Sequence, residues 1–432
     1  MLKGKGEISM IDIVKLLKEN KDITDYKVNG VSLTTYENFF VKGKLETVRV
    51  TDTEDAVVTV YVEGDGTLGD SSFSVYASMT EKQVADKIAS AAKRAKLVKN
   101  KPYSIPCGDK LEVNIPSDFE NYESYELANQ IAKAVEKADS YQNGSINALE
   151  IFIYREKTSV VNSKGVDKCQ TRYRAMIEAI PTWTENGESV ELYEAYHFTD
   201  FNADEITAEI DERMREVRDR QIAQKPQPCK INVVLNAKEV AQVMSELADS
   251  LNFATVYSRA NVFSKGDKVQ KDAVGDKITL TACHEIKGSR FSSVFDEDGV
   301  TLKDKEIISS GVATAYYGSN RFGSYLNEEI TGNLRCLRLE KGSLTKEEIS
   351  KEPYIECVSL SGIQLDLYND YVGGEIRLAY YHNGDKIIPV TGISMSGKLS
   401  EVLNAIRLLD KTVAKDYYEG PEKALLKDMS II

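Results

Sequence analysis

Apolar and polar residues alternate along much of the chain, and this pattern predicts many β-strands with a few amphipathic helices between them. The runs 47–50 and 57–62 are rich in β-branched residues and are bounded by acidic turns, which is typical of strands. Thr80 begins a capping-box pattern in front of a helix predicted over 81–97, and a short amphipathic helix is predicted after Ser9. The first half of the chain therefore mixes strands with capped helices.

The same order of predicted elements occurs twice in this first half. Strands within 24–76 precede the helix at 81–97, and strands within 149–198 precede a long helix that begins after Asn202. A further helix is predicted over 121–138, between the two stretches. We interpret the repeat as an internal duplication of a βββα element; the alternative is that two unrelated mixed segments coincide.

The segment 225–228, Lys-Pro-Gln-Pro, marks the predicted domain boundary, because two prolines disfavour the continuation of both helices and strands. Strands and loops dominate the pattern beyond residue 255. A chain of 432 residues is long enough for two hydrophobic cores. We therefore expect an α+β protein with a mixed α/β N-terminal domain at 1–226 and a β-rich C-terminal domain at 227–432.

The clearest element of the second half is a β-hairpin. Residues alternate between polar and apolar from Glu375 to Tyr381, and a second apolar run follows at 386–393. Asn383-Gly384 supplies two residues that tolerate the positive φ angles of a tight hairpin turn. Pro389 lies in the second run and has no N–H to donate, so we expect this strand at a sheet edge or at a bulge.

Residues 375–397, EIRLAYYHNGDKIIPVTGISMSG, resemble the C-terminal signature of the TldD/PmbA family. The segments LDLYND (365–370), FDEDGV (295–300) and TGNLR (331–335) resemble the same family, whereas the first half matches it only in its general pattern. The family pairs a zinc peptidase subunit, TldD, with a metal-free relative, PmbA or TldE. An older description of its members is modulator of DNA gyrase.

The resemblance implies that a zinc-binding member carries H-E-x-x-x-H and a cysteine beyond the signature hairpin. Here His284-Glu285 is followed by Ser289 in place of the second histidine, and the tail after Leu399 contains no cysteine. The residues before His284 are typical of a strand and not of a ligand-bearing helix. We therefore expect no metal, no cofactor and no catalytic residue in this chain, which resembles the PmbA/TldE-like members.

Four residues of the signature region are candidates for contact with a peptide or a partner: Asp366, Asp370, Arg377 and Tyr380. Two carboxylates and a guanidinium among tyrosines could hold a peptide backbone or a partner loop. The alternative is a structural ion pair that keeps the strands in register. The acidic segment 296–299 lacks the ligand spacing of a calcium-binding EF-hand loop, so a solvated turn is expected there.

Composition and charge limit the partners and the compartment. The net charge of −13 repels a phosphate backbone, so no nucleic-acid partner is expected. Six cysteines without a C-x-x-C pair fit free thiols in a reducing compartment. No apolar stretch approaches the roughly 20 residues of a membrane span, and the N-terminal residues have no apolar core long enough for a signal peptide. We expect a cytoplasmic protein with no membrane contact.

The resemblance implies a non-catalytic subunit of a metallopeptidase complex that acts on unstructured peptides. Its partner would be a TldD-like zinc peptidase subunit or a second copy of the chain, and the apolar runs of the hairpin predict a subunit interface in the C-terminal domain. The alternative is a homo-oligomeric binding or scaffold protein without peptidase activity. A neighbouring reading frame with H-E-x-x-x-H and a downstream cysteine would favour the peptidase complex.

Overall fold

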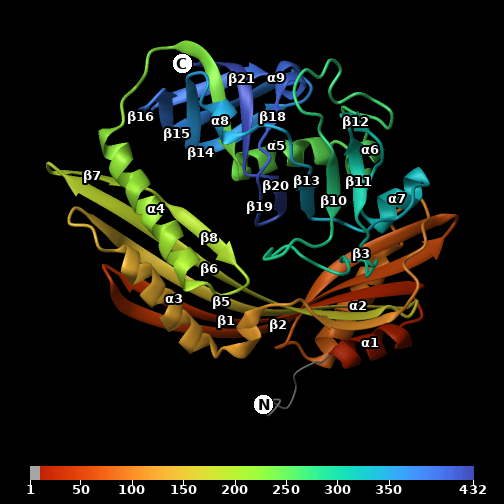
Figure 1. Cartoon of the computed structure of the whole chain (residues 1–432). Helices are drawn as coiled ribbons and strands as arrows, with labels where there is room; N and C mark the ends of the chain where they lie inside the picture. The colour runs from red at the N-terminus through yellow and green to blue at the C-terminus, as the bar shows by residue number, and fades with distance from the viewer. Residues whose placement is uncertain (1–9) are drawn as a thin grey trace.

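The computed structural model describes residues 10–432. One large sheet is built by the first half of the chain, and the second half lies across from it, joined through helix α4 (Figure 1). The predicted start of the first helix at Ser9 lies outside the described residues, and helix α1 is described from Met10. None of the helices within residues 10–432 is long and apolar enough to cross a lipid bilayer.

The N-terminal half forms an eight-stranded sheet in the order β3-β2-β1-β5-β6-β4, with β7 and β8 also paired to β6. All of its strand pairs are antiparallel except β4–β6. The strands are β1 (Asp25–Val41), β2 (Lys44–Gly64), β3 (Thr67–Tyr76), β4 (Lys110–Asn114), β5 (Gly144–Asn162), β6 (Asp167–Glu185), β7 (Glu188–Glu191) and β8 (Glu194–Phe198). The helices are α1 (Met10–Glu19), α2 (Glu81–Ala95), α3 (Ser124–Ala138) and α4 (Ala203–Ile222).

Two units with the same element order make up most of this sheet; β4 lies between the units in the chain, and β7 is an additional strand of the second unit. The first is α1-β1-β2-β3-α2 and the second is α3-β5-β6-β8-α4, and they join where β1 pairs antiparallel with β5. Reading outward from this central pair, β2 and β6 come next and β3 and β8 lie outside them. The predicted βββα repeat is therefore present in the topology. The helix predicted at 121–138 is α3, which belongs to the second unit as the counterpart of α1 and is not a spacer between the units.

Local capping explains where α2 and α4, the last helices of the two units, begin. The Thr80 hydroxyl accepts a hydrogen bond from the Gln83 N–H, and the Gln83 side chain accepts one from the Thr80 N–H, which confirms the capping box of α2. Asn202 accepts hydrogen bonds from the N–H groups of Asp204 and Glu205 at the start of α4. In each unit, apolar helix residues pack on one face of the sheet and leave the other face to the rest of the chain.

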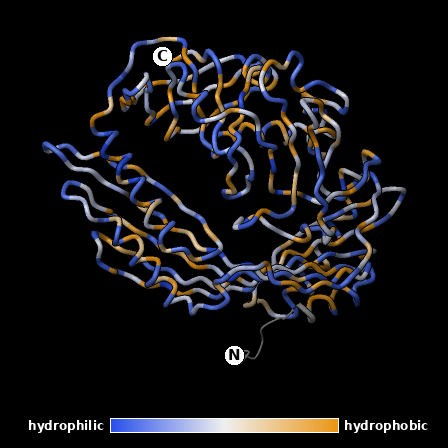
Figure 2. Tube along the Cα trace, viewed as in Figure 1, coloured by the Kyte–Doolittle hydropathy of each residue, from blue (hydrophilic) through white to orange (hydrophobic). Residues whose placement is uncertain are grey.

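The C-terminal half contains two sheets with helix α5 between them. Val240, Met244 and Leu247 of this helix share one hydrophobic core with strands from both sheets. A helix that is covered on two sides needs apolar residues around most of its circumference, and α5 has them. Figure 2 shows hydrophobic residues recurring throughout the interior of this half and along the helices that lie against the N-terminal sheet.

The elements of the C-terminal half are as follows. The seven-stranded sheet, ordered β14-β9-β21-β17-β15-β16 with β18 beside β21, contains β9 (Cys229–Asn236), β14 (Tyr354–Asp366), β15 (Tyr371–Asn383), β16 (Lys386–Val390), β17 (Ile393–Lys398), β18 (Arg407–Leu408) and β21 (Lys423–Ile431). The six-stranded sheet, ordered β12-β11-β10-β13-β20-β19, contains β10 (Leu280–Cys283), β11 (Lys305–Ser309), β12 (Val312–Ala313), β13 (Cys336–Leu339), β19 (Thr412–Lys415) and β20 (Tyr418–Pro421). The helices are α5 (Ala237–Asp249), α6 (Phe253–Tyr257), α7 (Asn320–Leu326), α8 (Lys346–Ile349) and α9 (Leu399–Ala405).

The segment between α4 and β9 is fixed to the edge of the C-terminal half. The Gln224 N–H donates to the carbonyl of Pro389 at 3.0 Å, and the Thr391 N–H donates to the carbonyl of Gln224 at 3.1 Å. No described helix or strand spans residues 225–228. A domain boundary at 226/227 stays a prediction that is compatible with the separate sheets on either side.

The signature hairpin is present, but its turn differs from the prediction. Asn383 lies opposite Lys386, so the two turn residues are Gly384 and Asp385. Of the residues 383–385, only Gly384 has a positive φ, at 59°. Glycine at the first of two central positions is typical of a type II′ turn, so the assignment of Asn383-Gly384 as the turn pair was wrong. The edge position of Pro389 is confirmed, because β16 is the last strand of its sheet.

Replacing Gly384 with valine is expected to lower the free energy of unfolding by about 1 to 3 kcal/mol, because a β-branched residue is strained at positive φ. The site has no neighbouring atom within 4 Å of an added Cβ, so the backbone angle is the sole source of the loss. Thermal melting measures it. Asp385→Val is the matched control, since it places the same side chain in the same turn at a residue without positive φ. Equal melting temperatures for the two variants would contradict the turn assignment.

Candidate functional site between the two halves of the chain

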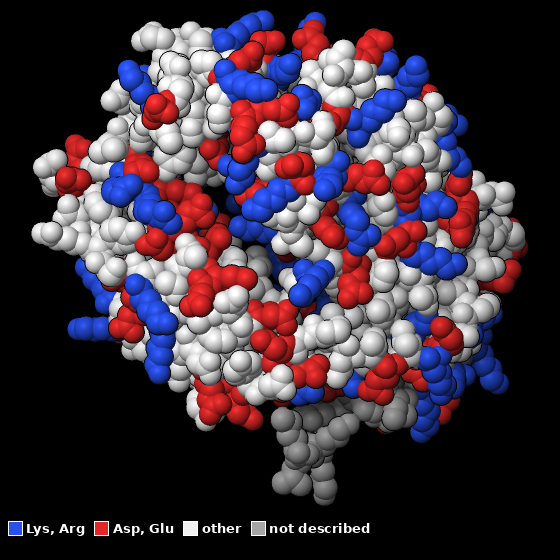
Figure 3. All heavy atoms as spheres, in the orientation of Figure 1, with Lys and Arg blue, Asp and Glu red and all other residues white. Residues whose placement is uncertain are grey.

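A polar cleft lies between the N-terminal sheet and the connection from β10 to β11. Two adjoining cavities, of about 250 and 380 Å³, occupy it, and Arg172 of β6 lines both. Figure 3 shows that the surface is hollowed near the middle of the molecule, between the two halves. The floor is the sheet face that the helices leave uncovered, and the opposite wall is made of loops from the C-terminal half.

The strand register explains which side chains reach the cleft. Glu156 of β5 lies directly opposite Arg172 of β6, so both side chains emerge on the same face of the sheet. Their carboxylate and guanidinium form an ion pair, and Arg172 also donates to the backbone carbonyls of Arg290 and Ser292 at 3.4 and 3.5 Å. Arg172 therefore joins the sheet to the loop above it.

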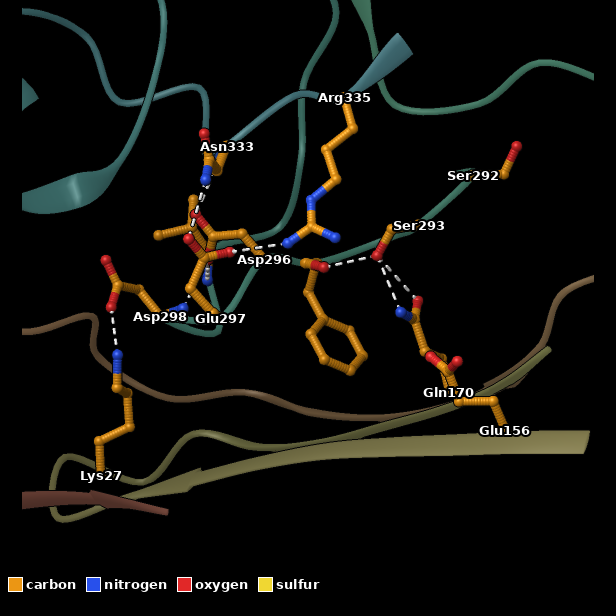
Figure 4. A network of polar contacts seen from close by, with 12 residues as sticks. Lys27, Glu156, Gln170, Ser292, Ser293, Asp296, Glu297, Asp298, Asn333 and Arg335 are labelled. Atoms are coloured by element: carbon orange, nitrogen blue, oxygen red, sulfur yellow. Dashed lines mark hydrogen bonds and ion pairs between the residues drawn. The ribbon is translucent and has the colours of Figure 1, made fainter. Parts of the chain in front are cut away.

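Gln170 makes a second connection between the same two segments. Its side-chain amide donates to the Ser293 hydroxyl at 2.8 Å, and its carbonyl oxygen accepts from the Val294 N–H at 3.1 Å. Nearby, the buried Lys168 ammonium donates to the Thr301 hydroxyl at 2.6 Å. Figure 4 shows Gln170 and Ser293 facing each other across the cleft. The loop is thus held in place by side chains of β6 that alternate along one face.

Asp296 fixes the loop that forms the far wall. One carboxylate oxygen accepts from the N–H groups of Asp298 at 2.9 Å and Val300 at 3.0 Å, and the other accepts from the Asn333 N–H at 3.0 Å. Burial raises the pKa of Asp296 to about 7, helped by the charges of Asp298 and Glu297 and opposed by the N–H donors. The side chain is only 6% exposed, so the predicted solvated turn was wrong at this residue. The FDEDGV and TGNLR segments meet here.

Arg335 extends from the second of these segments toward the cavity (Figure 4). Its guanidinium lies 3.8 Å from the Glu297 carboxylate, which also accepts a hydrogen bond from the Asn333 side chain at 2.8 Å. The Arg335 side chain is 55% exposed. Within the described chain it donates no hydrogen bond to another residue, although its fork carries five N–H donors.

The His284-Glu285 segment lies at the other end of the cleft. Strand β10 ends at Cys283, which confirms a strand before His284, and residues 284–293 are an irregular loop without a helix. The His284 imidazole contacts the Asp304 carboxylate at 2.5 Å. Ser289 is buried, and its hydroxyl lies 3.7 Å from the sulfur of Cys336. A zincin site requires two histidine ligands on one face of a helix, and residues 284–293 form no helix.

Arg290, which follows Ser289, forms a bidentate ion pair with Asp416. Arg290 donates from Nε and Nη2 to the two carboxylate oxygens of Asp416, at 3.0 and 3.2 Å. The guanidinium charge thus lies next to the position where the resemblance would place a zinc ligand. Among residues 10–432, no three histidine, cysteine or acidic side chains converge in a way that could hold a metal ion.

The predicted contact residues of the signature region do not form one site. The Asp366 carboxylate accepts from the N–H groups of Tyr368 and Asn369 in the turn after β14. The Asp370 carboxylate accepts from the N–H and hydroxyl of Ser400 at 2.6 and 2.7 Å, and Asp370 itself has a φ of 54°. Both carboxylates therefore organise turns.

The other two candidates lie further along β15. Arg377 donates to the Ser361 hydroxyl at 2.9 Å. No ion pair joins Arg377 to Asp366 or Asp370 in the described structure, so the prediction of an ion pair that holds the strands in register was wrong. The Tyr380 hydroxyl donates to the Asp219 carboxylate of α4 at 2.8 Å, which ties the two halves together. A role of these four residues in contact with a peptide or partner stays a prediction.

Comparisons with known proteins bear on the C-terminal half first. Residues 228–432 match the family model described as PmbA/TldA metallopeptidase C-terminal domain. No curated protein matches the sequence. The fold resembles the crystal structure of TldE from Thermococcus kodakarensis, with a TM-score of 0.81 at 14% identity over 98% of this chain and 99% of that one.

Two further solved structures share the fold. A proposed modulator of a DNA gyrase from Thermotoga maritima MSB8 has a TM-score of 0.77 at 15% identity, over 97% of this chain and 98% of that one. Another, from Bacteroides thetaiotaomicron VPI-5482, has a TM-score of 0.76 at 14% identity, over 97% of each chain. Identities this low show a common fold and nothing finer. The family model and the signature segments agree: residues 228–432 match the C-terminal domain of PmbA/TldA metallopeptidases, and the whole chain shares the fold of these solved structures.

Proposed function

We propose that this chain is the metal-free, non-catalytic subunit of a TldD/PmbA-type metallopeptidase complex that acts on unstructured peptides. The observation that carries the proposal is the ion pair of Arg290 with Asp416, beside the buried Ser289. A guanidinium has no lone pair to offer a metal, its ion pair occupies the Asp416 carboxylate, and Ser289 replaces the second imidazole that zinc would need. A TldD-like partner would carry the zinc and the chemistry.

The nearby thiols support the same conclusion. Burial raises the pKa of Cys336 to about 11 and that of Cys283 to about 12. Zinc binds the thiolate and displaces the proton, so zinc binding here would also have to overcome the cost of two buried thiolates. His284, the one histidine of the segment, is held by Asp304 and has no second imidazole beside it.

The test is co-expression with a TldD-like protein from the same genome, followed by a cleavage assay on an unstructured peptide. We expect a joint complex in light scattering and cleavage only when both chains are present. Substituting the glutamate of the partner's H-E-x-x-x-H should abolish cleavage, whereas His284→Ala in this chain should leave the rate unchanged. Cleavage at the full rate by the partner alone would contradict the proposal.

The assembly experiment also tests the alternative, a homo-oligomeric scaffold. The signature hairpin exposes Ile387 at 60% and Ile388 at 36%, in keeping with a subunit contact at this edge. An obligate interface should bury more than about 2,000 Å². A chain that forms a stable oligomer with itself and ignores every co-expressed TldD-like protein would favour the scaffold.

The isolated chain is expected to bind no stoichiometric zinc, because the Arg290–Asp416 pair and the neutral thiols leave no suitable ligand set. Elemental analysis after dialysis against a zinc-containing buffer and then a zinc-free one gives the metal content. The His284→Ala variant is the control for adventitious binding, and its zinc content should equal that of the parent. One retained zinc per chain that disappears in the variant would refute the expectation.

A further inference from the structure

We propose that the cavity beside Arg335 binds the terminal carboxylate of a short, extended peptide. This inference rests on the proposed function, since it assigns a peptide-binding role to the non-catalytic subunit. The cavity lies between β1, β5 and β6 on one side and the FDEDGV and TGNLR segments on the other. Its volume of about 250 Å³ suits the end of a chain and not a folded partner.

Arg335 supplies the group that an anion needs. Its guanidinium lines the cavity, is 55% exposed, and has the Glu297 carboxylate 3.8 Å away as its ion-pair partner. At that separation the two groups attract each other without forming a hydrogen bond. The planar fork is therefore available for the two parallel N–H···O bonds that a carboxylate accepts.

Two polar atoms in the sheet floor point to a ligand with hydrogen-bond donors. The side-chain oxygens of Asn29 and Thr158 are buried, and neither has a hydrogen-bond partner in the described structure. Both residues line the cavity. They share one face of the sheet, because Val31 lies opposite Thr158 and Asn29 lies opposite Val160. A buried oxygen without a partner is costly, and the backbone N–H groups of a peptide would satisfy both.

The other residues that line the cavity limit the kind of ligand that it can bind. Phe291, Phe295 and Leu302 form an apolar wall, which suits side chains of a peptide better than a bare inorganic anion. Glu156 and Glu297 also line the cavity, so a doubly charged phosphate would meet repulsion that a singly charged carboxylate meets less. An extended peptide end combines one carboxylate, several N–H donors and apolar side chains.

The test uses fluorescence anisotropy with a labelled, unstructured hexapeptide that has a free carboxyl terminus, and the same peptide as its C-terminal amide. We expect the free acid to bind the isolated chain at least tenfold more tightly than the amide. Arg335→Gln should lower affinity for the acid to that for the amide, and Arg335→Lys should retain part of the preference. Arg155→Gln is the matched control: it lies next to Glu156 on β5, so its side chain points to the opposite face of the sheet.

Thr158→Val separates a binding role from a structural one. Replacing an unsatisfied hydroxyl with a methyl group should leave the melting temperature of the free protein unchanged or raised, while weakening peptide binding severalfold. Equal affinity for acid and amide, or unchanged binding in Arg335→Gln, would overturn the proposal. A preference for free glutamate over the hexapeptide would also overturn it, because the site would then take an amino acid.

These measurements need no partner subunit, metal or turnover. A chain that binds the acid but assembles with no TldD-like protein would keep the peptide site and remove the peptidase complex. A chain that supports cleavage by the partner but binds the acid no better than the amide would keep the peptidase complex and remove the peptide site. The two failures are therefore distinguishable.

Discussion

Replacing Asp296 with alanine is expected to lower the free energy of unfolding by about 3 to 5 kcal/mol, since each buried donor left unsatisfied costs about 1 to 3 kcal/mol. The two side-chain oxygens of Asp296 accept hydrogen bonds from three backbone N–H groups, those of Asp298, Val300 and Asn333. Without it, the FDEDGV loop would lose its internal turn and its link to the TGNLR segment. Urea unfolding at pH 5 measures the loss.

Asp296→Asn is the matched control. The amide keeps one oxygen for Asp298 and Val300 but turns an NH₂ group toward the Asn333 N–H, so the expected loss is smaller, about 1 to 2 kcal/mol. Both variants should also change the pH dependence of stability. The folded pKa of Asp296 is raised to about 7 from an ordinary value of 3.8.

The sign of this pH effect follows from proton linkage. Between pH 4 and 7 the unfolded chain has released the Asp296 proton and the folded chain still holds it, so the contribution of Asp296 to stability falls as pH rises through this range. The loss caused by Asp296→Ala should therefore be larger at pH 5 than at pH 8. The same loss at both pH values would show that the carboxylate is already ionised in the folded state at pH 5.

Gly69→Ala is expected to cost about 3 kcal/mol or more, at the upper end of what overpacking does. Gly69 lies in β3 against the end of α2, where an added Cβ would come within 1.8 Å of the Ala95 carbonyl oxygen and 2.7 Å of that of Val98. These are backbone atoms, so no side-chain rotation relieves the contact. Strand and helix would have to separate, which opens the core of the first unit.

Gly64→Ala provides the comparison within the same hairpin. An added Cβ at Gly64 meets no atom within 4 Å, and its φ is not in the left-handed region. Replacing such a glycine restricts the unfolded chain, so stability should be unchanged or higher by about 0.4 to 1 kcal/mol. Melting curves of both variants test the pair. A Gly69→Ala protein as stable as the parent would mean that β3 and α2 do not approach this closely.

Features set by neighbouring residues were predictable from the sequence. The capping box at Thr80 depends on contacts three residues apart, and the long strands depend on an alternation of period two. The βββα repeat was visible because both signals recur in the same order. The signature hairpin was also predicted. Its turn lies one residue later than expected, at Gly384-Asp385 and not at Asn383-Gly384, and sequence patterns of this kind do not resolve a shift of one residue.

The cleft was not predictable in this way because its contacts join distant segments. Gln170 and Ser293 are 123 residues apart, and Asp296 is 37 residues from Asn333. Nothing in the local sequence distinguishes Gln170 from any other polar residue facing outward from a strand. The FDEDGV and TGNLR segments could have signalled the far wall, but an acidic turn with a glycine resembles ordinary solvated turns. Burial of Asp296 becomes apparent only when both halves of the chain are in place.

The pairing of β1 with β5 has a consequence for synthesis of the chain. More than a hundred residues separate the end of β1 at Val41 from the start of β5 at Gly144. At roughly 5 to 20 residues per second, the ribosome leaves one edge of β1 without its partner for roughly 5 to 20 seconds. Nascent chains on one messenger would present this open edge to each other at high local concentration. Until β5 has been made, the open edge of β1 can pair with the same edge of a neighbouring copy.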